Sequence, residues 1–295
     1  GGRVDGMPEL LVIANETVGG RRLLEALRQR AKVHDSLHVR LVVPQNRPRH
    51  GSVIYVDAAA AAAQTRLELG LAMLLEEGID ATGEVGDPDP FAATMDAIGD
   101  RTPDEIIIST LPATASGWLR RDLVERVAEA SGLPVQHVVT DIDAEGLPYD
   151  ISLVVANQTA DSPALLANLK EKAASGGDHV FIIVVPQSSA DAPGARESAA
   201  HLKGALAALH DAGLLASGLV GDPDPFTATM NALQFFRVNR VIISTLPETR
   251  SGWMRADLIE RVGRYAACPV EHVVAEPEAE TEPETETETT RPIGA

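Results

Sequence analysis

The sequence predicts an α/β protein with two tandem Rossmann-like domains, each built on a five-stranded parallel sheet of strand order 3-2-1-4-5. Three observations support this prediction. The chain repeats itself internally, short apolar runs alternate with longer segments of helical periodicity, and 295 residues suffice for two ordinary domains. Because aromatic residues make up only 3% of the chain, Ala, Val, Leu and Ile have to fill both cores.

The internal repeat is the strongest of these observations. The sequence Val-Gly-Asp-Pro-Asp-Pro-Phe at 85–91 returns 135 residues later at 220–226, and Ile-Ile-Ser-Thr-Leu-Pro at 107–112 returns at 242–247 with the same offset. Further upstream the offset is 142, so the second copy lacks seven residues between the two regions. Self-similarity in a fixed register indicates two copies of one structural unit.

In the first copy, apolar runs bounded by turn residues predict strands, and the amphipathic segments between them predict helices. The predicted strands are 10–14, 37–43, 79–85, 105–109 and 135–139. The predicted helices are 18–33, 58–77, 90–98 and 118–130. The third helix begins with Asp89 as N-cap and Pro90 in its first turn. The second copy repeats this order.

These elements divide the chain into five parts. We expect a flexible N-terminus at 1–8, a first domain at 9–140, a polar linker at 141–150 and a second domain at 151–275. Residues 276–295 are acidic and lack apolar periodicity, so they cannot offset their ordering entropy by burial. We expect this tail to be disordered.

Charge and composition argue against several classes of function. The chain has 25 Lys and Arg against 43 Asp and Glu, and a net charge of −18 repels nucleic acid and anionic membranes. The sequence shows no signal pattern and no run of about eighteen apolar residues. Its one cysteine, Cys268, cannot form an internal disulfide. We therefore expect a cytoplasmic protein that binds neither nucleic acid nor membrane.

Several short motifs resemble the universal stress protein family. They are Leu-Val-Ile-Ala-Asn at 11–15, Gly-Asp-Pro at 86–88, Asp-Glu-Ile-Ile-Ile at 104–108 and Ala-Cys-Pro-Val at 267–270, and they follow the family's order. The resemblance covers nearly all of both copies. It implies the adenine nucleotide alpha hydrolase-like fold, a role in the stress response, and adenine nucleotide as the cofactor to consider.

The nucleotide loop of that family is altered here. Nucleotide-binding members carry an acidic residue after the first strand and a glycine-rich loop after the fourth, and an asparagine stands at the acidic position in each copy. Pro112 and Pro247 replace a loop glycine, which removes a backbone N–H and fixes φ. Asp122 and Asp257 place carboxylates where phosphate oxygens would lie. We therefore expect no ATP binding in the usual family manner.

A ligand crevice is nevertheless expected beyond the carboxyl ends of strands one and four, where the strand order reverses. Neutral polar side chains of both copies gather there and suit a base, a ribose or another small polar ligand. The candidates are Asn15, Thr17, Gln45, Ser109, Thr110 and Ser116 in the first copy and Asn157, Thr159, Gln187, Ser244, Thr245 and Ser251 in the second. The alternative is that Asn15 and Thr17 cap the first helix and Ser116 caps the fourth.

Catalytic and metal sites have no support in the sequence. Asp87 and Asp89 offer two carboxylates, whereas a hard cation takes about six oxygens. His137 and His272 have no partner at ligand spacing and are interpreted as edge or interface residues. No Ser-His-Asp order, nucleophile elbow, Walker loop or His-Glu-x-x-His sequence is present. We expect no catalytic residue and no bound metal.

Three functions remain open. The first is a stress-associated binding or regulatory protein, not an enzyme, that takes an unknown protein partner or a small polar ligand. The second is an adenine-nucleotide binder, for ATP or AMP, with at most slow hydrolysis. The third is an interaction scaffold whose acidic tail engages a basic partner. In each case we expect an intramolecular pseudo-dimer in which the fifth strands, 134–139 and 269–274, pair with each other, with a further homodimer left open.

Overall fold

The computed structural model describes residues 7–34, 36–45, 56–112, 118, 122–247 and 257–275. The first copy alternates strands and helices in the predicted order. Its elements are β1 (Glu9–Ile13), α1 (Arg21–Val33), β2 (His38–Pro44), α2 (Val56–Glu76), β3 (Asp80–Gly86), α3 (Pro90–Asp100), β4 (Glu105–Thr110), α4 (Leu123–Ser131) and β5 (Val135–Val139). The expected acidic tail, residues 276–295, lies outside the described residues.

A short helix, α5 (Ile142–Glu145), leads into the second copy. The elements of that copy are β6 (Tyr149–Val155), α6 (Pro163–Ala174), β7 (Asp178–Pro186), α7 (Ala192–Asp211), β8 (Leu215–Gly221), α8 (Pro225–Phe235), β9 (Arg240–Thr245), α10 (Leu258–Tyr265) and β10 (Val270–Val274). The segment expected as a plain linker, 141–150, therefore contains a helix and the start of a strand.

Each copy forms one five-stranded parallel sheet. The first sheet has the order β3-β2-β1-β4-β5 and the second the order β8-β7-β6-β9-β10, so the predicted fold class and strand order are confirmed in both copies. Every residue of β1 is buried, as expected for a central parallel strand covered on both faces. Apart from Phe181, the largest fully buried side chains are Leu and Ile, so the cores are aliphatic.

Two helices of the first copy begin later than their apolar periodicity predicts. Helix α1 starts at Arg21 instead of residue 18, because the chain first makes a turn in which Gly19 has a φ of +75°. Helix α4 starts at Leu123 instead of residue 118, directly after Asp122, whose φ is +48°. Residues in the left-handed region interrupt a helix, and the apolar pattern does not reveal them.

The third helix of each copy begins at the predicted aspartate and proline. Asp89 occupies the N-cap position of α3, but its side chain makes no capping hydrogen bond. Its backbone N–H instead donates to Asp87 Oδ1 at 2.7 Å. In the second copy the expected cap forms, because Asp224 Oδ2 accepts from the Thr227 N–H at 3.0 Å. These aspartates stabilise a turn and a helix start.

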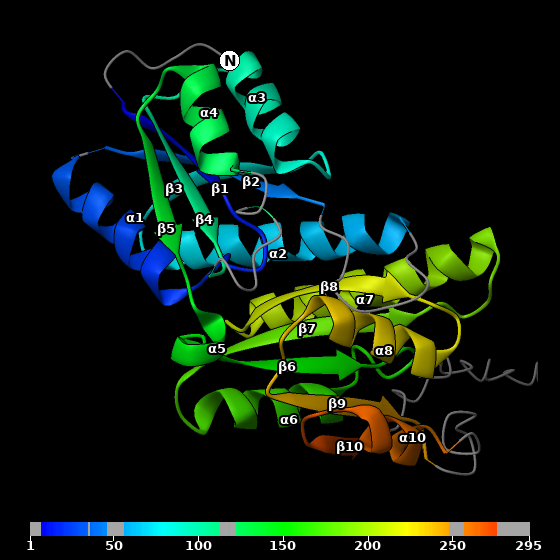
Figure 1. Ribbon diagram of the computed structural model, residues 1–295. Helices are drawn as coiled ribbons and strands as arrows, with labels where there is room; N and C mark the ends of the chain where they lie inside the picture. The colour runs from blue at the N-terminus through cyan, green and yellow to red at the C-terminus, as the bar shows by residue number, and fades with distance from the viewer. Residues whose placement is uncertain are drawn as a thin grey trace, which may run out of the picture.

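The predicted contact between the fifth strands is wrong. In the described sheets β5 pairs with β4 and β10 pairs with β9, so each lies at the edge of its own sheet. Helix α2 lies between the two sheets instead (Figure 1). The edge strands are poor candidates for a seam because they carry exposed His137 and His272, whereas α2 offers a long apolar surface.

Helix α2 packs into both cores. Ala63, Leu67 and Leu74 belong to the core of the first copy, on one side of the helix. The other side contributes Ala62, Leu69 and Met73 to the core of the second copy, and we call these three residues the docking face of α2. A helix that is apolar on opposite sides is buried on both, so α2 joins the two domains.

Polar contacts fix the position of α2 on the second copy. Thr65 Oγ1 donates to the Gly218 carbonyl at 3.1 Å, and Ser217 donates to the Glu68 carboxylate. Arg66 donates to the carbonyl of Phe235 at the end of α8 and lies over the neighbouring aromatic ring, with 5.2 Å between its Cζ and the ring centroid. Burial lowers the pKa of Arg66 to about 10, so the guanidinium remains cationic at neutral pH.

The connector between the copies is also anchored. Arg21 donates to the Leu147 carbonyl at 3.2 Å, and Arg22 forms an ion pair with Glu145 at 2.5 Å.

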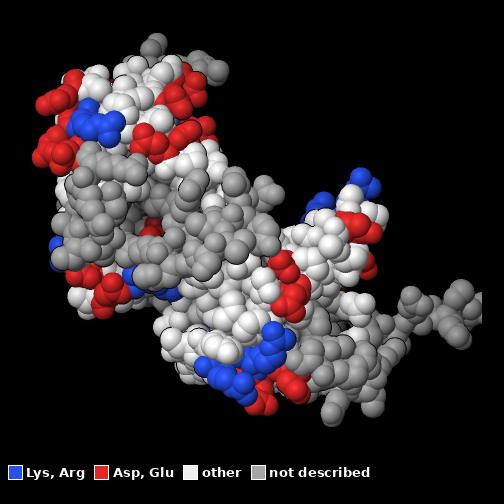
Figure 2. All heavy atoms as spheres, turned by 45° about the vertical axis from the view of Figure 1, so that its right-hand side comes forward, with Lys and Arg blue, Asp and Glu red and all other residues white. Residues whose placement is uncertain are grey.

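The far end of the first copy, formed by α3 and α4, is acidic in the space-filling view (Figure 2). Among the described helices, none combines the length and apolar character that crossing a membrane requires.

Candidate ligand crevices

The described candidate residues lie at the carboxyl ends of the strands that flank the reversal of strand order. In the first copy Asn15 and Thr17 follow β1, Gln45 follows β2, and Ser109 and Thr110 end β4. The second copy places its candidates in the same way after β6, after β7 and at the end of β9: Asn157, Thr159, Gln187, Ser244 and Thr245. Ser116 and Ser251 lie outside the described residues.

In the first copy the crevice is closed by its own side chains. Asn15 Nδ2 donates to the Pro44 carbonyl, which ties the end of β1 to the end of β2. Thr17 Oγ1 donates to the Ser109 carbonyl at 3.2 Å, which ties the same loop to the end of β4. Neither side chain caps α1, whose N-cap is Gly20, so the capping interpretation of Asn15 and Thr17 is wrong.

In the second copy the equivalent side chains are arranged differently. Asn157 Nδ2 donates to the Pro186 carbonyl at 2.9 Å, and Asn157 Oδ1 lies 2.8 Å from His201 Nδ1. Asn157 is half-buried, whereas Asn15 is only 2% exposed. The hydroxyl of Thr159 has no hydrogen-bond partner within the described part of the chain, although it is buried. The second crevice therefore has a free polar group where the first has a closing hydrogen bond.

One buried serine in each crevice also lacks a partner. Ser109 and Ser244, next to last in β4 and β9, are each 1% exposed, and neither hydroxyl bonds to another described residue. Buried polar groups are nearly always hydrogen-bonded, because leaving one unpaired costs about 1–3 kcal/mol. An unpaired serine hydroxyl therefore lies at the same position in both copies, near the carboxyl ends of β4 and β9. The hydrogen-bonding capacity at these strand ends is not fully used by the described residues.

A threonine–histidine pair recurs beside each crevice. Thr110 Oγ1 lies 2.8 Å from His137 Nε2, and Thr245 Oγ1 lies 2.8 Å from His272 Nε2. Thr245 also donates its hydroxyl proton to the Leu246 carbonyl at 2.8 Å, so the imidazole is the donor in that pair. Desolvation lowers the pKa of both histidines. The sequence interpretation placed the histidines at an edge but missed their threonine partners, although both residue types recur at the offset of 135.

The loop after β1 is further fixed by the connector. A Cβ on Gly19 would lie 2.1 Å from the Tyr149 hydroxyl oxygen, and a Cβ on Gly20 would lie 2.4 Å from Thr140 Cγ2. Tyr149 donates to the Val18 carbonyl at 3.4 Å, and burial raises the pKa of its hydroxyl, which therefore stays protonated. Only glycine fits at these two positions. The connector thus packs tightly against the loop after β1.

The positions that replace the phosphate loop are unfavourable for an anion. Pro112 and Pro247 follow β4 and β9 with no backbone N–H to donate. Asp122 and Asp257 directly precede α4 and α10 in the left-handed conformation, with φ of 48° and 49°, and neither side chain caps its helix. A carboxylate there interacts favourably with the helix N-terminus and would repel phosphate oxygens. The described residues contain no group of three or more His, Cys, Asp or Glu able to hold a metal ion.

Comparison with known proteins finds solved structures to which this chain is similar. No family model and no curated protein matches the chain. The chain is similar to a universal stress protein from Archaeoglobus fulgidus, with 18% identity over 90% of this chain and 96% of that one and a TM-score of 0.34. It is also similar to a protein from Pseudomonas aeruginosa described as a universal stress protein, with 14% identity over 91% and 94% of the two chains and a TM-score of 0.32.

Proposed function

We propose that this chain is a stress-associated binding or regulatory protein of the universal stress type, in which the crevice of the second copy binds a small, neutral, polar ligand. The observation that carries the proposal is the difference between two equivalent threonines. Thr17 closes the first crevice by donating to the Ser109 carbonyl, whereas the Thr159 hydroxyl has no partner among the described residues. A ligand that bonds to Thr159 would satisfy a buried group that is costly to leave unpaired.

The surroundings of Thr159 favour neutral donors and acceptors on the ligand. Asn157 is held by the Pro186 carbonyl and by His201, and it is half-buried, so it can contact a bound molecule without rearranging. Gln187 follows β7 and is also half-buried. Amide and hydroxyl groups of this kind match the hydrogen-bonding pattern of a nucleobase or a ribose. Adenosine is therefore a suitable first probe.

A triphosphate fits the same crevice poorly. Pro247 cannot donate a backbone N–H, and Asp257 adds a negative charge at the start of α10. We therefore propose that neither copy binds ATP in the manner of nucleotide-binding family members and that the crevices do not catalyse its hydrolysis. Thr110 and Thr245 are already engaged by histidines, with 2.8 Å between each Oγ1 and the histidine Nε2, which leaves them poorly suited to attack a ligand.

Thermal-shift measurement with adenosine, AMP, ADP, ATP and cyclic nucleotides tests this proposal. A ligand present at 100 times its dissociation constant adds about 2.7 kcal/mol to the free energy of unfolding. We expect stabilisation by adenosine that falls as phosphates are added. The substitution Thr159→Val should remove the shift, and the matched substitution Thr17→Val should keep it. Micromolar binding of MgATP in calorimetry would contradict the proposal and favour a nucleotide-binding function.

A further inference from the structure

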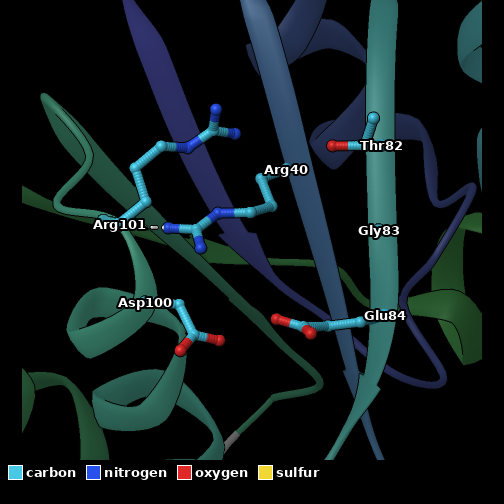
Figure 3. A pocket seen from close by; sticks show the side chains of 6 residues that line it. All are labelled: Arg40, Thr82, Gly83, Glu84, Asp100 and Arg101. Carbon is cyan, nitrogen blue, oxygen red and sulfur yellow. Dashed lines mark hydrogen bonds between the residues drawn. The ribbon is translucent and has the colours of Figure 1, made fainter. Parts of the chain in front are cut away.

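A second polar site lies on the first copy, away from both crevices. A surface pocket of about 340 Å³ is bordered by β2, β3 and the end of α3. Its lining residues are Arg40, Thr82, Gly83, Glu84, Asp100 and Arg101 (Figure 3). A Cβ on Gly83 would meet Leu67 of α2, and side chains alternate along a strand, so Thr82 and Glu84 point away from α2. The pocket therefore opens on the face of the first sheet that α2 leaves uncovered.

Thr82 of this pocket belongs to a linear hydrogen-bonded relay with two neighbouring side chains, His38 and Asp80. His38 Nδ1 lies 2.7 Å from Asp80 Oδ2, and His38 Nε2 lies 2.9 Å from Thr82 Oγ1. The sheet register creates the arrangement, because His38 is the direct partner of Asp80 and Thr82 is two residues further along the same face of β3. Carboxylate, imidazole and hydroxyl in this order have the connectivity of a nucleophile activated by an oriented base.

We infer that Thr82, His38 and Asp80 form a hydrolytic triad that cleaves small carboxylic esters. This inference goes beyond the proposed binding function and concerns a different site. Thr82 is exposed and lines the pocket, so its hydroxyl can reach a substrate. In the triad, His38 has the tautomer that donates Nδ1–H to Asp80, which leaves Nε2 free to take the threonine proton.

The chemistry is a two-step acyl transfer. Thr82 Oγ1 attacks the ester carbonyl carbon as its proton passes to His38 Nε2, and the tetrahedral intermediate then expels the alcohol, which takes that proton from His38. Water next attacks the acyl-threonine, giving one proton to His38 Nε2, and collapse releases the carboxylic acid as the proton returns to Thr82. The net reaction consumes one ester and one water and yields one acid and one alcohol, with no other reactant.

Arg101, which lines the same pocket as Thr82, is the cation that we assign to stabilise the developing negative charge. Its Nε forms an ion pair with Glu9 Oε2 at 2.6 Å, and its side chain is 40% exposed at the pocket. A guanidinium has five N–H groups, so the ion pair leaves donors for a substrate oxygen. Arg40 is a positioning residue: it donates to the Ala97 carbonyl at 2.7 Å and to the Arg101 carbonyl at 2.5 Å, which fixes the end of α3.

The second copy lacks this relay. The positions equivalent to His38 and Asp80 are occupied by Val180 and Leu215, which are partners in the corresponding strand register. The position of Thr82 is occupied by Ser217, whose hydroxyl donates to Glu68 of α2. The relay is therefore specific to the first copy and to the face that remains open to solvent. It is not a consequence of the repeat itself.

Hydrolysis of p-nitrophenyl acetate by the full chain tests the inference. The variants are Thr82→Val, which keeps the side-chain shape without the hydroxyl, His38→Gln, and Thr82→Ser, which restores a hydroxyl. We expect Thr82→Val and His38→Gln to lower the rate at least tenfold and Thr82→Ser to keep it. The control His34→Gln, which removes an imidazole outside the relay, should retain the parent rate. A Thr82→Val variant as active as the parent would overturn the inference, provided that both melt at the same temperature.

The acyl intermediate gives a second, independent measurement. Acid quenching during turnover, followed by digestion and mass spectrometry, should find acetyl on the peptide that contains Thr82 in the parent. The same peptide should be unmodified in Thr82→Val and in His38→Gln. Acetylation confined to lysine side chains in all three proteins would show that the ester reacts with surface amines alone, and it would overturn the triad. Ligand binding in the second crevice is measured separately, so either proposal can fail without the other.

Discussion

Over β2 and β3 of the first copy, the face of the sheet opposite α2 opens into a surface pocket, whereas α2 covers the equivalent face of the second copy. The difference follows from substitutions at equivalent positions. Polar residues of the first copy and their apolar counterparts in the second are Glu9 and Ile151, His38 and Val180, Arg40 and Ile182, Asp80 and Leu215, Glu84 and Leu219, and Arg101 and Phe236. Most of these counterparts are buried in the core that includes α2. Charged groups of the first copy either pair with one another or reach water, and the aliphatic groups of the second copy require a covering helix.

The equivalent helices α2 and α7 also differ in whether the side that faces away from their own sheet is apolar. Leu67 of α2 and Leu202 of α7 occupy equivalent positions, since each packs against the equivalent strand glycine, Gly83 or Gly218. From this register Ala62, Leu69 and Met73 of the docking face correspond to Glu197, Gly204 and Ala208 of α7. One helix is therefore suited to dock and the other to face solvent. The comparison teaches how two copies of one fold come to pack in a single arrangement. In the first copy the outer face of α2 became apolar, and in the second copy the sheet face that α2 covers became apolar.

The largest effect is expected from a charge placed in the docking face. Leu69 is 6% exposed and packs in the core of the second copy, so Leu69→Lys removes a buried side chain and desolvates an ammonium. We expect a loss of about 3–5 kcal/mol in the free energy of unfolding. The matched substitution Gly204→Lys on exposed α7 should be neutral or slightly stabilising, because lysine favours a helix over glycine.

Chemical denaturation measures both variants of this pair, and small-angle scattering reports whether the two domains separate. Equal stability of Leu69→Lys and Gly204→Lys would mean that α2 does not hold the domains together. The comparison between the two helices would then have to be abandoned.

A smaller effect is expected from the ion cluster on the open face. Arg40 Nε lies 3.1 Å from Glu9 Oε1, and both residues are less than 10% exposed. Arg40→Ile introduces the residue found at the second copy's equivalent position. Among the described residues it leaves buried Glu9 with Arg101 alone as its cation, and we expect a loss of about 2–4 kcal/mol in the free energy of unfolding. Adding Glu9→Ile should recover at least half of that loss, because paired buried charges contribute little net stability.

Equilibrium unfolding of the single and double variants forms a thermodynamic cycle for this pair. Additive losses would show that Glu9 and Arg40 are energetically independent, against the geometry.

The smallest effect concerns a feature that the two copies share. The folded-state pKa of His137 and of His272 is lowered by desolvation, so the unfolded chain binds protons more readily. Stability is therefore lost as the pH falls below about 6.5, the ordinary histidine pKa, and the loss ends once the pH is below the folded-state value. Calorimetry between pH 7.5 and about 5 should show a shallower fall in Tm for the double variant His137→Gln, His272→Gln. An unchanged slope would show that these histidines are not linked to folding.

The sequence by itself determined the architecture of each copy. The repeat at 85–91 and 220–226, the aliphatic runs and the alternation of strands with helices were sufficient for two parallel sheets and their strand order. These features depend on local periodicity and on burial, which composition and spacing report directly. The polar residues that gather at the strand ends follow from the same topology, because parallel strands end at one edge of the sheet.

Only the tertiary structure decided how the copies meet and which polar groups find each other. The apolar character of α2 is visible in the sequence, but its second burial surface is formed by Ile182 and Phe236, more than a hundred residues away. The relay of His38, Asp80 and Thr82 depends on the register of two strands, and a slip of one residue would send its members to opposite faces. Contacts between distant segments are set by packing, and for that physical reason no local pattern in the chain encodes them.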